Sequence, residues 1–486
     1  MSNRKTMNQK INRRILLVDP PGWQGAVNGN PAFPNIGLAY LIPVLQKAHW
    51  EVSLFDLNNE LFDPQNFFSR IDSFSPHIIG FSCKTATFAA AEELAAEIRK
   101  RYGKEIKLCF GGPHITLNYQ SLAEQKNSMA DLLFVGEGEI DLPVALEALF
   151  QNKIFCNLKN GHIMDLGIPV YLPDRRISLD ELDFPDYSLF GEDVKRHNQE
   201  HYPIVTSRGC PYGCIYCTVP LINGRQWRYR SVENIIEELQ YAKQKYHIRQ
   251  FQIIDDSWNV DMDRCKRMCR ELISRNLQLR WYCPNGIRAD RIDKELAELM
   301  YASGCQQASV GLESGSPQVF ARINKGTTLD AIERGIHFLQ QAQINVSAFF
   351  IIGLPGDSMK DVTLSIKLIR RLKIAANFNI LMPYPHTAVY NEIKCHGRML
   401  NKNIVSLHFS NDLKRLTPVF EWNNFSASEI KRAFVVAHLE LGMYNRILKE
   451  SGWKRYWELF LLYLCYQPSG LPRGIFRILV LKRSIA

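Results

Sequence analysis

Residues 208–217, "RGCPYGCIYC", decide how the rest of the chain is interpreted. They hold three cysteines in the spacing C-x-x-x-C-x-x-C, on a segment that glycine and proline make tight. A short strand pattern, "HYPIVTSRGC", leads into them. Three thiolates this close together can converge on one soft metal centre. The candidate ligands are Cys210, Cys214 and Cys217.

Three kinds of cysteine site fit this spacing to different degrees. A structural zinc site usually needs a fourth ligand, and no His or Cys follows at zinc-finger spacing. A thioredoxin-type pair needs only Cys214 and Cys217 and should open a helix after a strand. An iron–sulfur cube held by three cysteines leaves one iron open for a substrate. A structural zinc protein stays as the fallback interpretation.

Counted with the strand that leads into the cysteines, the chain repeats a strand followed by a helix about six times, ending near residue 400. This repeat predicts a partial (β/α)6 barrel, in which active residues lie at the carboxyl ends of strands. Each polar residue found there could also simply cap the next helix or form a surface ion pair. The candidates are Asp255, Asp256, Asn285, Arg288, Glu313, Ser314, Asp357, Tyr384 and His386.

The first 150 residues predict a doubly wound parallel sheet of the flavodoxin or Rossmann-like kind. Five apolar strand patterns alternate with helices, beginning at about residues 15–19. Ligands of such sheets bind outside the carboxyl ends of the strands. The loops there are "DPPGWQG", "SCKTAT", "GGPHITL" and "VGEGE", and Ser82, Thr85 and Thr116 could hydrogen-bond a ligand. No G-x-G-x-x-G follows the first strand, which argues against a dinucleotide.

This N-terminal segment resembles the cobalamin-binding domain found at the N-terminus of many radical SAM enzymes, where SAM is S-adenosylmethionine. The resemblance rests on "PPGWQG", "FGGPHITL" and "FVGEGE", over roughly residues 15–150. The loop after the first strand lacks the Asp-x-His-x-x-Gly motif, so the resemblance implies cobalamin without a His ligand from that loop. We do not assign His114 to cobalt. The implied cobalamin contacts are Ser82, Thr85, Gly111, Gly112, Gly136, Glu137 and Gly138.

The cysteine segment, with Tyr216 just before its last cysteine, resembles the signature of the radical SAM superfamily. The resemblance implies a 4Fe-4S cluster on the three cysteines, whose open iron chelates SAM, and cleavage of SAM to a 5′-deoxyadenosyl radical. The motifs "DDSWNVD", "NGIRAD", "VGLESGS", "INKGTT", "GLPGDS" and "MPYPHT" extend it to about residue 400. The implied SAM-site residues are Tyr216, Asp255, Asp256, Arg288, Glu313 and the segment 353–356; Asp357 stands where many relatives have Glu.

Composition limits the partners. The 486 residues carry 59 Lys and Arg against 49 Asp and Glu, a net charge of +10. This charge allows an anionic cofactor. The sequence has no basic block typical of nucleic-acid binding.

No secretory signal and no run of about 18 apolar residues is present, so we expect a cytoplasmic protein. Its twelve cysteines are then thiols or metal ligands rather than disulfides. Cys265 and Cys269, four apart on one helix face, are expected to be core thiols.

We therefore predict four segments: a cobalamin-binding domain (1–150), an extended connector rich in Pro and Asp (151–199), the radical SAM barrel (200–400) and a helical C-terminal segment (401–486). The last is aromatic and basic. It is either a cap on the barrel or an amphipathic element that lies on a membrane and reaches a lipidic substrate.

The prediction for function is a cobalamin-dependent enzyme like the class B radical SAM methyltransferases. It would methylate an unactivated carbon of a secondary metabolite, lipid or tetrapyrrole, with electrons from a donor such as flavodoxin or ferredoxin. The cofactors carry this chemistry and the protein orients them. Two alternatives stay open: a radical SAM cyclase or rearrangement enzyme that uses cobalamin without methyl transfer, and a non-catalytic cobalamin- or cluster-binding sensor.

Overall fold

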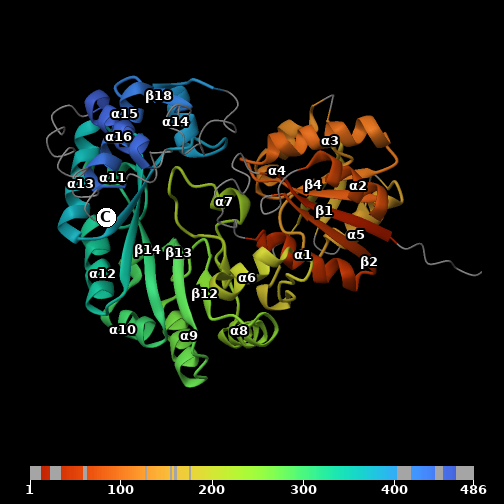
Figure 1. Ribbon diagram of the computed structural model, residues 1–486, viewed down its shortest axis with the longest axis horizontal. Coiled ribbons are helices and arrows are strands. Elements are labelled where there is room, and N and C mark those ends of the chain that lie inside the picture. The colour runs from red at the N-terminus through yellow and green to blue at the C-terminus, as the bar shows by residue number, and fades with distance from the viewer. Residues whose placement is uncertain are drawn as a thin grey trace, which may run out of the picture. The chain divides into compact units, whose positions relative to one another are not determined.

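The computed structural model of the chain folds into two compact units, residues 1–198 and 199–486 (Figure 1). The residues described are 13–21, 34–57, 63–125, 128–153, 156–157, 161–174, 177–401, 418–443 and 452–466. Each unit is built on its own parallel sheet. Among the described residues, no helix is both long enough and apolar enough to cross a membrane.

The first unit is an eight-stranded sheet in the order β2-β1-β3-β4-β5-β8-β7-β6. Strands β1 to β5 and β8 are parallel, and the order 2-1-3-4-5 is that of flavodoxin-like sheets. The strands are β1 (Arg13–Asp19), β2 (Trp50–Asp56), β3 (Ile78–Ser82), β4 (Lys107–Gly111), β5 (Leu132–Phe134), β6 (Cys156–Asn157), β7 (Gly161–Asp165) and β8 (Pro169–Pro173). The order places a topological switch point between β1 and β3, where such sheets bind ligands.

Helices cover this sheet and bury an apolar core. Leu16, Val18, Ile79 and Leu108 on the strands are fully buried, as their continuous apolar runs predict. The helices are α1 (Ile36–Lys47), α2 (Pro64–Phe74), α3 (Phe88–Tyr102), α4 (Pro113–Ala123), α5 (Leu142–Phe150), the short 3-10 turn η1 (Leu179–Glu181) and α6 (Glu192–His201).

Two parts of this unit differ from the prediction. The segment "GGPHITL" was expected to be a loop, but Pro113 begins helix α4, because proline suits the first helical position. The segment expected as an extended connector holds β6, β7 and β8, which extend the first sheet. These strands are short and contain polar residues, so the sequence shows no long apolar run there.

The second unit is built on a six-stranded parallel sheet in the order β16-β15-β14-β13-β12-β9. Its strands are β9 (Tyr202–Ile204), β12 (Gln250–Ile253), β13 (Arg280–Ile287), β14 (Cys305–Glu313), β15 (Asn345–Ile352) and β16 (Ala375–Ile380). Strand order follows chain order, as expected for consecutive strand–helix repeats of a partial barrel. Short strands pair separately: β10 (Ser207–Arg208) with β11 (Arg228–Tyr229), and β17 (Gly397–Met399) with β18 (Phe420–Trp422).

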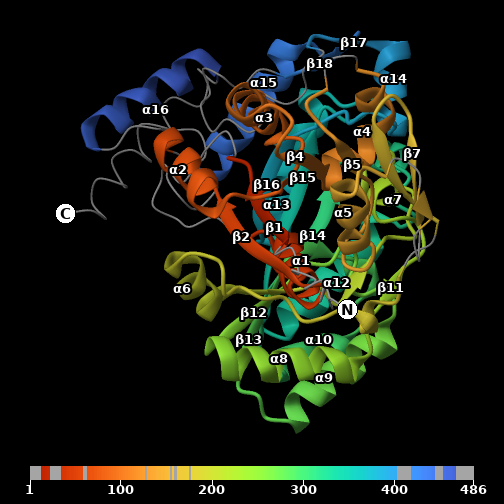
Figure 2. The same cartoon turned by 90° about the vertical axis from the view of Figure 1, so that its right-hand side faces the viewer.

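Helices α10, α12 and α15 contact the strands of this sheet. Helices α8 and α9 lie side by side, as Figure 2 shows, while α10 contacts β14 and α12 contacts β15. Cys265 and Cys269 on α9 are fully buried, which confirms that they are core thiols. The helices are α7 (Val219–Ile222), α8 (Val232–Tyr246), α9 (Met262–Ser274), η2 (Ala289–Arg291), α10 (Lys294–Ala302), α11 (Pro317–Arg322), α12 (Leu329–Gln341), α13 (Met359–Leu372), α14 (Ala388–His396), α15 (Ala427–Leu441) and α16 (Gly452–Tyr466).

Candidate functional site

The cysteine loop follows β9, the edge strand of the second sheet, at its carboxyl end. Gly209 lies at φ +85°, and an added Cβ there would overlap the carbonyl oxygen of Gln226, so only glycine fits. The Cys210 amide donates to Gly224 O (3.2 Å), and the Cys217 amide donates to Cys214 O (3.2 Å). The first contact ties the loop to residue 224, after α7, and the second makes a turn between Cys214 and Cys217.

The three thiols are half-buried neighbours. Burial, and after it the nearby Cys214 and Cys210, raise the pKa of Cys217 to about 12. Within the described residues, no three His, Cys, Asp or Glu side chains surround a single ion position. A cube needs a wider arrangement, because each cysteine binds a different iron. Three neighbouring, half-buried thiols are the donor set that a three-cysteine cluster needs.

Asp255 supports the strand that enters this loop. Its carboxylate accepts hydrogen bonds from the Thr206 amide, the Thr206 hydroxyl and the Ser207 hydroxyl, each 2.6 Å long. The side chain is buried, and burial raises its pKa although these donors oppose the shift. Arg264 donates from Nη2 to Thr206 O (2.9 Å) beside it. Asp255 thus fixes the residues immediately before the cysteines; its contact with SAM stays a prediction.

Asp256 holds the loop itself. Its Oδ2 accepts from the Gly209 amide (3.0 Å) and from Asn223 Nδ2 (2.7 Å). Asn223 follows α7, so the carboxylate ties the start of the cysteine loop to its end. Asp256 is a predicted site residue because it lies at a strand end. Asn223 could not be predicted from the sequence, because only the folded loop brings it to Asp256.

Tyr216 and Glu313, both predicted SAM-site residues, lie together. Burial and the carboxylate of Glu313, which accepts a hydrogen bond from the phenol, raise the pKa of Tyr216. Glu313 ends β14 at φ +63°, a strained backbone position of the kind found at functional sites. Its Oε1 lies 2.8 Å from Lys325 Nζ. Lys325 belongs to the quoted motif "INKGTT", but nothing in that motif singled it out.

Arg288 also reaches the cysteine loop. Its guanidinium forms a two-pronged pair with Asp290 (2.8 and 2.7 Å) and donates from Nη1 to Lys325 O (2.7 Å). It lies 3.8 Å from the centre of the Tyr212 ring, within the range of a cation–π contact. Arg288 therefore stacks against a residue between the first two cysteines, and Tyr212 is a second neighbour that the sequence did not identify.

Several other strand-end candidates contact the backbone of the fold. Asn285 donates to the carbonyl after β12 (2.8 Å), and the Ser314 hydroxyl accepts from the amide two residues on (3.1 Å). Asp357 accepts from the Gly353 amide (2.8 Å) and the Ser358 amide (3.0 Å), and burial raises its pKa to about 7. Contacts of the segment 353–356 with adenine, and of Tyr384 and His386 with any ligand, stay predictions.

In the first unit, polar side chains meet at the switch point between β1 and β3. Asn35 Nδ2 donates to Asp19 Oδ1 (2.9 Å) and to the Ser82 hydroxyl (3.0 Å). Lys84 Nζ lies 3.8 Å from the same aspartate. The predicted ligand residue Ser82 thus belongs to a polar group at the expected ligand edge. The rest of the "DPPGWQG" loop, from residue 22, lies outside the described residues.

The loops after β3, β4 and β5 are joined by hydrogen bonds. The Thr85 hydroxyl lies 3.2 Å from His114 Nδ1, and the Thr116 hydroxyl accepts from the Gly136 amide (2.9 Å). Burial lowers the pKa of His114 to about 4, so its imidazole is neutral at pH 7. Glu137 and Gly138 continue the last of these loops. The predicted contact residues therefore share one edge of the sheet, whatever they bind.

Gly112 provides a test of this edge. It lies at φ +98° and ψ −178°, a region that only glycine occupies readily, and an added Cβ would come 2.8 Å from Cys83 O. We expect Gly112→Ala to cost about 1–3 kcal/mol and to weaken ligand binding at this edge. Thermal unfolding and cobalamin retention on gel filtration measure both.

The matched control is the adjacent Gly111→Ala. An added Cβ there finds its nearest atom at 3.7 Å, in ordinary contact, and the backbone is not left-handed. Equal melting temperatures for the two variants would contradict the assignment of Gly112 as a required glycine.

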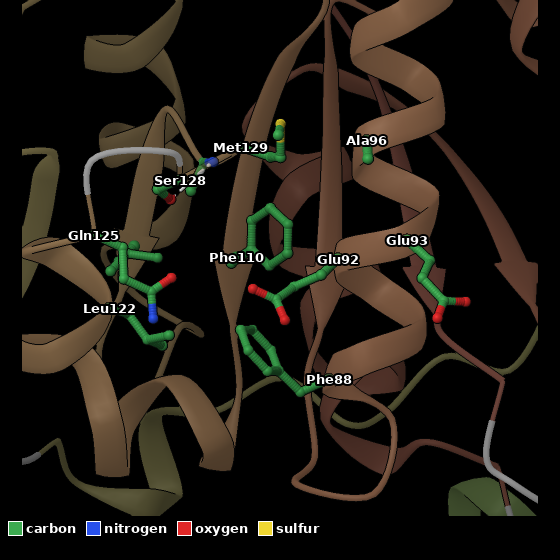
Figure 3. A pocket seen from close by; sticks show the side chains of 11 residues that line it. Phe88, Glu92, Glu93, Ala96, Phe110, Leu122, Gln125, Ser128 and Met129 are labelled. Carbon is green, nitrogen blue, oxygen red and sulfur yellow. Dashed lines mark hydrogen bonds between the residues drawn. The ribbon is translucent and has the colours of Figure 1, made fainter. Parts of the chain in front are cut away.

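A pocket of about 320 Å³ lies elsewhere in the first unit (Figure 3). It is formed by α3, by Phe110 on β4 and by residues 128–130 before β5. Burial raises the pKa of Glu92, whose carboxylate points into it. None of the predicted cobalamin contacts lines this pocket, so it is distinct from the ligand edge described above.

Comparison with known proteins identifies two families along the chain. Residues 204–369 match the model of the radical SAM superfamily, and residues 27–146 match that of the B12 binding domain. An uncharacterized methyltransferase of Pyrococcus horikoshii is 26% identical over 441 residues, which cover 90% of this chain and 94% of that protein. The bacteriochlorophyllide d C-12(1)-methyltransferase of Chlorobaculum tepidum is 29% identical over 393 residues, 79% of each chain.

Most of the chain is also similar in fold to a solved structure. The radical S-adenosylmethionine methyltransferase TsrM of Kitasatospora setae, solved with cobalamin and a [4Fe-4S] cluster, matches with a TM-score of 0.63 and 19% identity. The match covers 79% of this chain and 78% of that one. It confirms the predicted fold class, in which an α/β unit with a parallel sheet precedes a second parallel-sheet unit and C-terminal helices.

Proposed function

Because the chain belongs to the radical SAM superfamily and carries a B12 binding domain, we propose that it is a cobalamin-dependent C-methyltransferase. The observation that carries this proposal is the placement of the three-cysteine loop at the carboxyl end of the first strand of the parallel sheet in the second unit. The first unit of the same chain has a sheet with flavodoxin-like strand order. Two relatives that match over most of the chain are named methyltransferases, which supports the same activity. Two anaerobic magnesium-protoporphyrin IX monomethyl ester cyclases match over 78% of the chain and support the cyclase alternative.

The residues of this chain have distinct tasks in the proposed site. Cys210, Cys214 and Cys217 would hold the 4Fe-4S cluster and leave one iron for SAM, while Asp255 and Asp256 keep the loop in shape. When bound, the cluster supplies the electron that cleaves SAM, and cobalamin carries the methyl group. The cysteine set fits a cluster because its thiols are neighbours, half-buried and accessible to a substrate.

SAM itself would be oriented by residues that surround the cysteines. Tyr216, Glu313 and Arg288 lie in one contact network with the loop, so we propose that they line the SAM pocket. In the first unit we propose that cobalamin lies over Ser82, Thr85 and the loops 111–112 and 136–138, because hydrogen bonds bring these loops to one edge. The neutral His114 is stacked on Phe88 and is not required as a cobalt ligand.

Product analysis tests the proposed activity. Protein reconstituted with iron, sulfide and cobalamin is incubated anaerobically with SAM and a strong reductant, and the nucleosides are quantified. We expect 5′-deoxyadenosine and S-adenosylhomocysteine in the same reaction. Deoxyadenosine without S-adenosylhomocysteine would instead support a cyclase or rearrangement enzyme. SAM that is bound but never cleaved would support a sensor.

We also propose that a low-potential one-electron donor of the flavodoxin or ferredoxin kind serves the cluster, and that the protein works in the cytoplasm. Eleven cysteines of the described part of the chain are free thiols, which suits a reducing compartment. The substrate is proposed to be a small molecule, with a lipid as the second possibility.

One face of the C-terminal helix α16 carries exposed leucines, and this supports contact with a membrane, where a lipid substrate would be found. Leu459 and Tyr463 pack on α15, while Leu461 and Leu464 on another face are 40% and 48% exposed. Exposed leucines on a helix in a segment that the sequence shows to be aromatic and basic are typical of a surface-lying amphipathic element. We propose that this face of α16 lies on anionic membranes.

Vesicle sedimentation tests the membrane proposal. The full chain should pellet with phosphatidylglycerol-rich vesicles, and the double variant Leu461→Gln/Leu464→Gln should remain largely in the supernatant. Val144→Gln, an exposed apolar residue on α5, serves as the matched control and should pellet like the wild type. Equal recovery of all three proteins in the supernatant would end the membrane proposal.

A further inference from the structure

The turn of residues 323–326 clamps the cysteine loop from the side. The Ile215 amide donates to Ile323 O (3.2 Å), and Asn324 Nδ2 donates to Gly213 O (3.1 Å). Both contacts reach the stretch between the first and last cysteines. Side chain and backbone of one turn therefore fix the segment that carries Cys214.

Lys325 lies in this turn, and both its side chain and its backbone carbonyl have fixed partners. Its side chain is 10% exposed, and its ammonium lies 2.8 Å from the carboxylate of Glu313. Its carbonyl accepts the 2.7 Å hydrogen bond from Arg288. The pair fills the space beside Gly311, where an added Cβ would come 2.7 Å from the ammonium. Neither the position nor the orientation of the lysine is free to vary.

The lysine keeps its charge in this environment. Burial alone lowers the pKa of Lys325, but the Glu313 carboxylate and then Cys214 in its thiolate form outweigh it, so the pKa is raised overall. A buried ion pair adds little to stability, because the cost of removing both charges from water offsets their attraction. A role other than stability is therefore needed to explain a fixed cation next to a proposed cluster ligand.

We propose that Lys325 is a positioning residue that sets how readily the cluster accepts its electron. This inference rests on the proposed function only in that it requires the cluster. It does not depend on what happens to the substrate. In the step concerned, the oxidised cluster takes one electron from the one-electron donor; no bond forms or breaks and no proton moves. A cation fixed beside Cys214 stabilises the added negative charge, since Coulomb energies are larger away from water.

Redox titration followed by electron paramagnetic resonance tests this role. Wild type, Lys325→Met and Lys325→Arg are reconstituted with iron and sulfide and titrated at pH 8 without SAM. We expect Lys325→Met to keep its iron but to have a lower midpoint potential, with the ratio of reduced to oxidised cluster about tenfold lower at a given potential, or about 59 mV. Lys325→Arg should restore most of the difference because it keeps the charge.

Two further variants keep the result interpretable. Lys294→Met removes a charge from an exposed ion pair with Glu298 on α10 and should leave the potential unchanged. Glu313→Gln removes the anion of the pair and should raise the potential, which tests the same claim if Lys325→Met loads no cluster. Fully loaded Lys325→Met and Glu313→Gln with wild-type potentials would overturn the inference. A wild type that binds no iron would instead overturn the proposed function.

Discussion

Cys214→Ala protein, reconstituted anaerobically, is expected to lose the cluster and with it all measurable cleavage of SAM. Cys214 is the central cysteine of the loop and the one that the turn of residues 323–326 holds in place. Mutation of residues that only hydrogen-bond to the metal ligands typically lowers metal affinity or activity by about 10–100-fold. Removal of a proposed ligand should therefore lower 5′-deoxyadenosine formation by more than about 100-fold. Iron and sulfide analysis with a timed nucleoside assay measures both losses.

Cys395→Ala is the matched control for this experiment. Cys395 is an exposed free thiol on α14, so its loss should change neither iron content nor the rate of SAM cleavage. The account fails at this point if Cys214→Ala protein retains wild-type iron and sulfide, because the loop would then not be the cluster site.

Asp255→Ala is expected to give the largest loss of stability at the site. The substitution leaves the Thr206 amide and hydroxyl without their buried acceptor, leaves the Ser207 hydroxyl with only Ser257 O, and removes an anion that acts on Arg264. Removing one partner from a buried charged group typically costs about 3–5 kcal/mol. We expect the free energy of unfolding to fall by about this amount, with a parallel loss of iron on reconstitution.

Denaturant unfolding of the iron-free protein measures the stability effect separately from the cluster. Asp263→Ala, an exposed acidic residue in the first turn of α9, is the control and should cost less than about 1 kcal/mol. A similar small effect for Asp255→Ala would mean that its three hydrogen bonds do not hold the strand before the cysteines.

Much of the fold could be predicted because the relevant patterns are local. The buried strands read as apolar runs, and the repeat of strand and helix in the second unit follows chain order. Helix α2 between the second and third strands was missed, as was α4, since Gly112 and Pro113 at its start look like a turn. Strands β6 to β8 were missed because their segment is rich in proline and aspartate, and β6 and β7 depend on antiparallel pairing with the sheet.

The site shows the same division between local and distant information. The three cysteines could be predicted because their spacing lies within eight consecutive residues, 210–217. Lys325 and Asn324 could not, because Asn324 meets its partner Gly213 across 111 positions of the chain. Asp255 was selected for its strand end, but its hydrogen bonds to Thr206 and Ser207 depend on two strands becoming neighbours in the sheet.

The most direct test of the central claim is the fate of SAM on the reconstituted protein. The protein is loaded with iron, sulfide and cobalamin, then given SAM carrying a deuterated methyl group and dithionite under strict exclusion of oxygen. The account predicts 5′-deoxyadenosine and S-adenosylhomocysteine from the same sample, and no deoxyadenosine from Cys214→Ala. Intact SAM after incubation with protein that holds its full iron and cobalamin would contradict it.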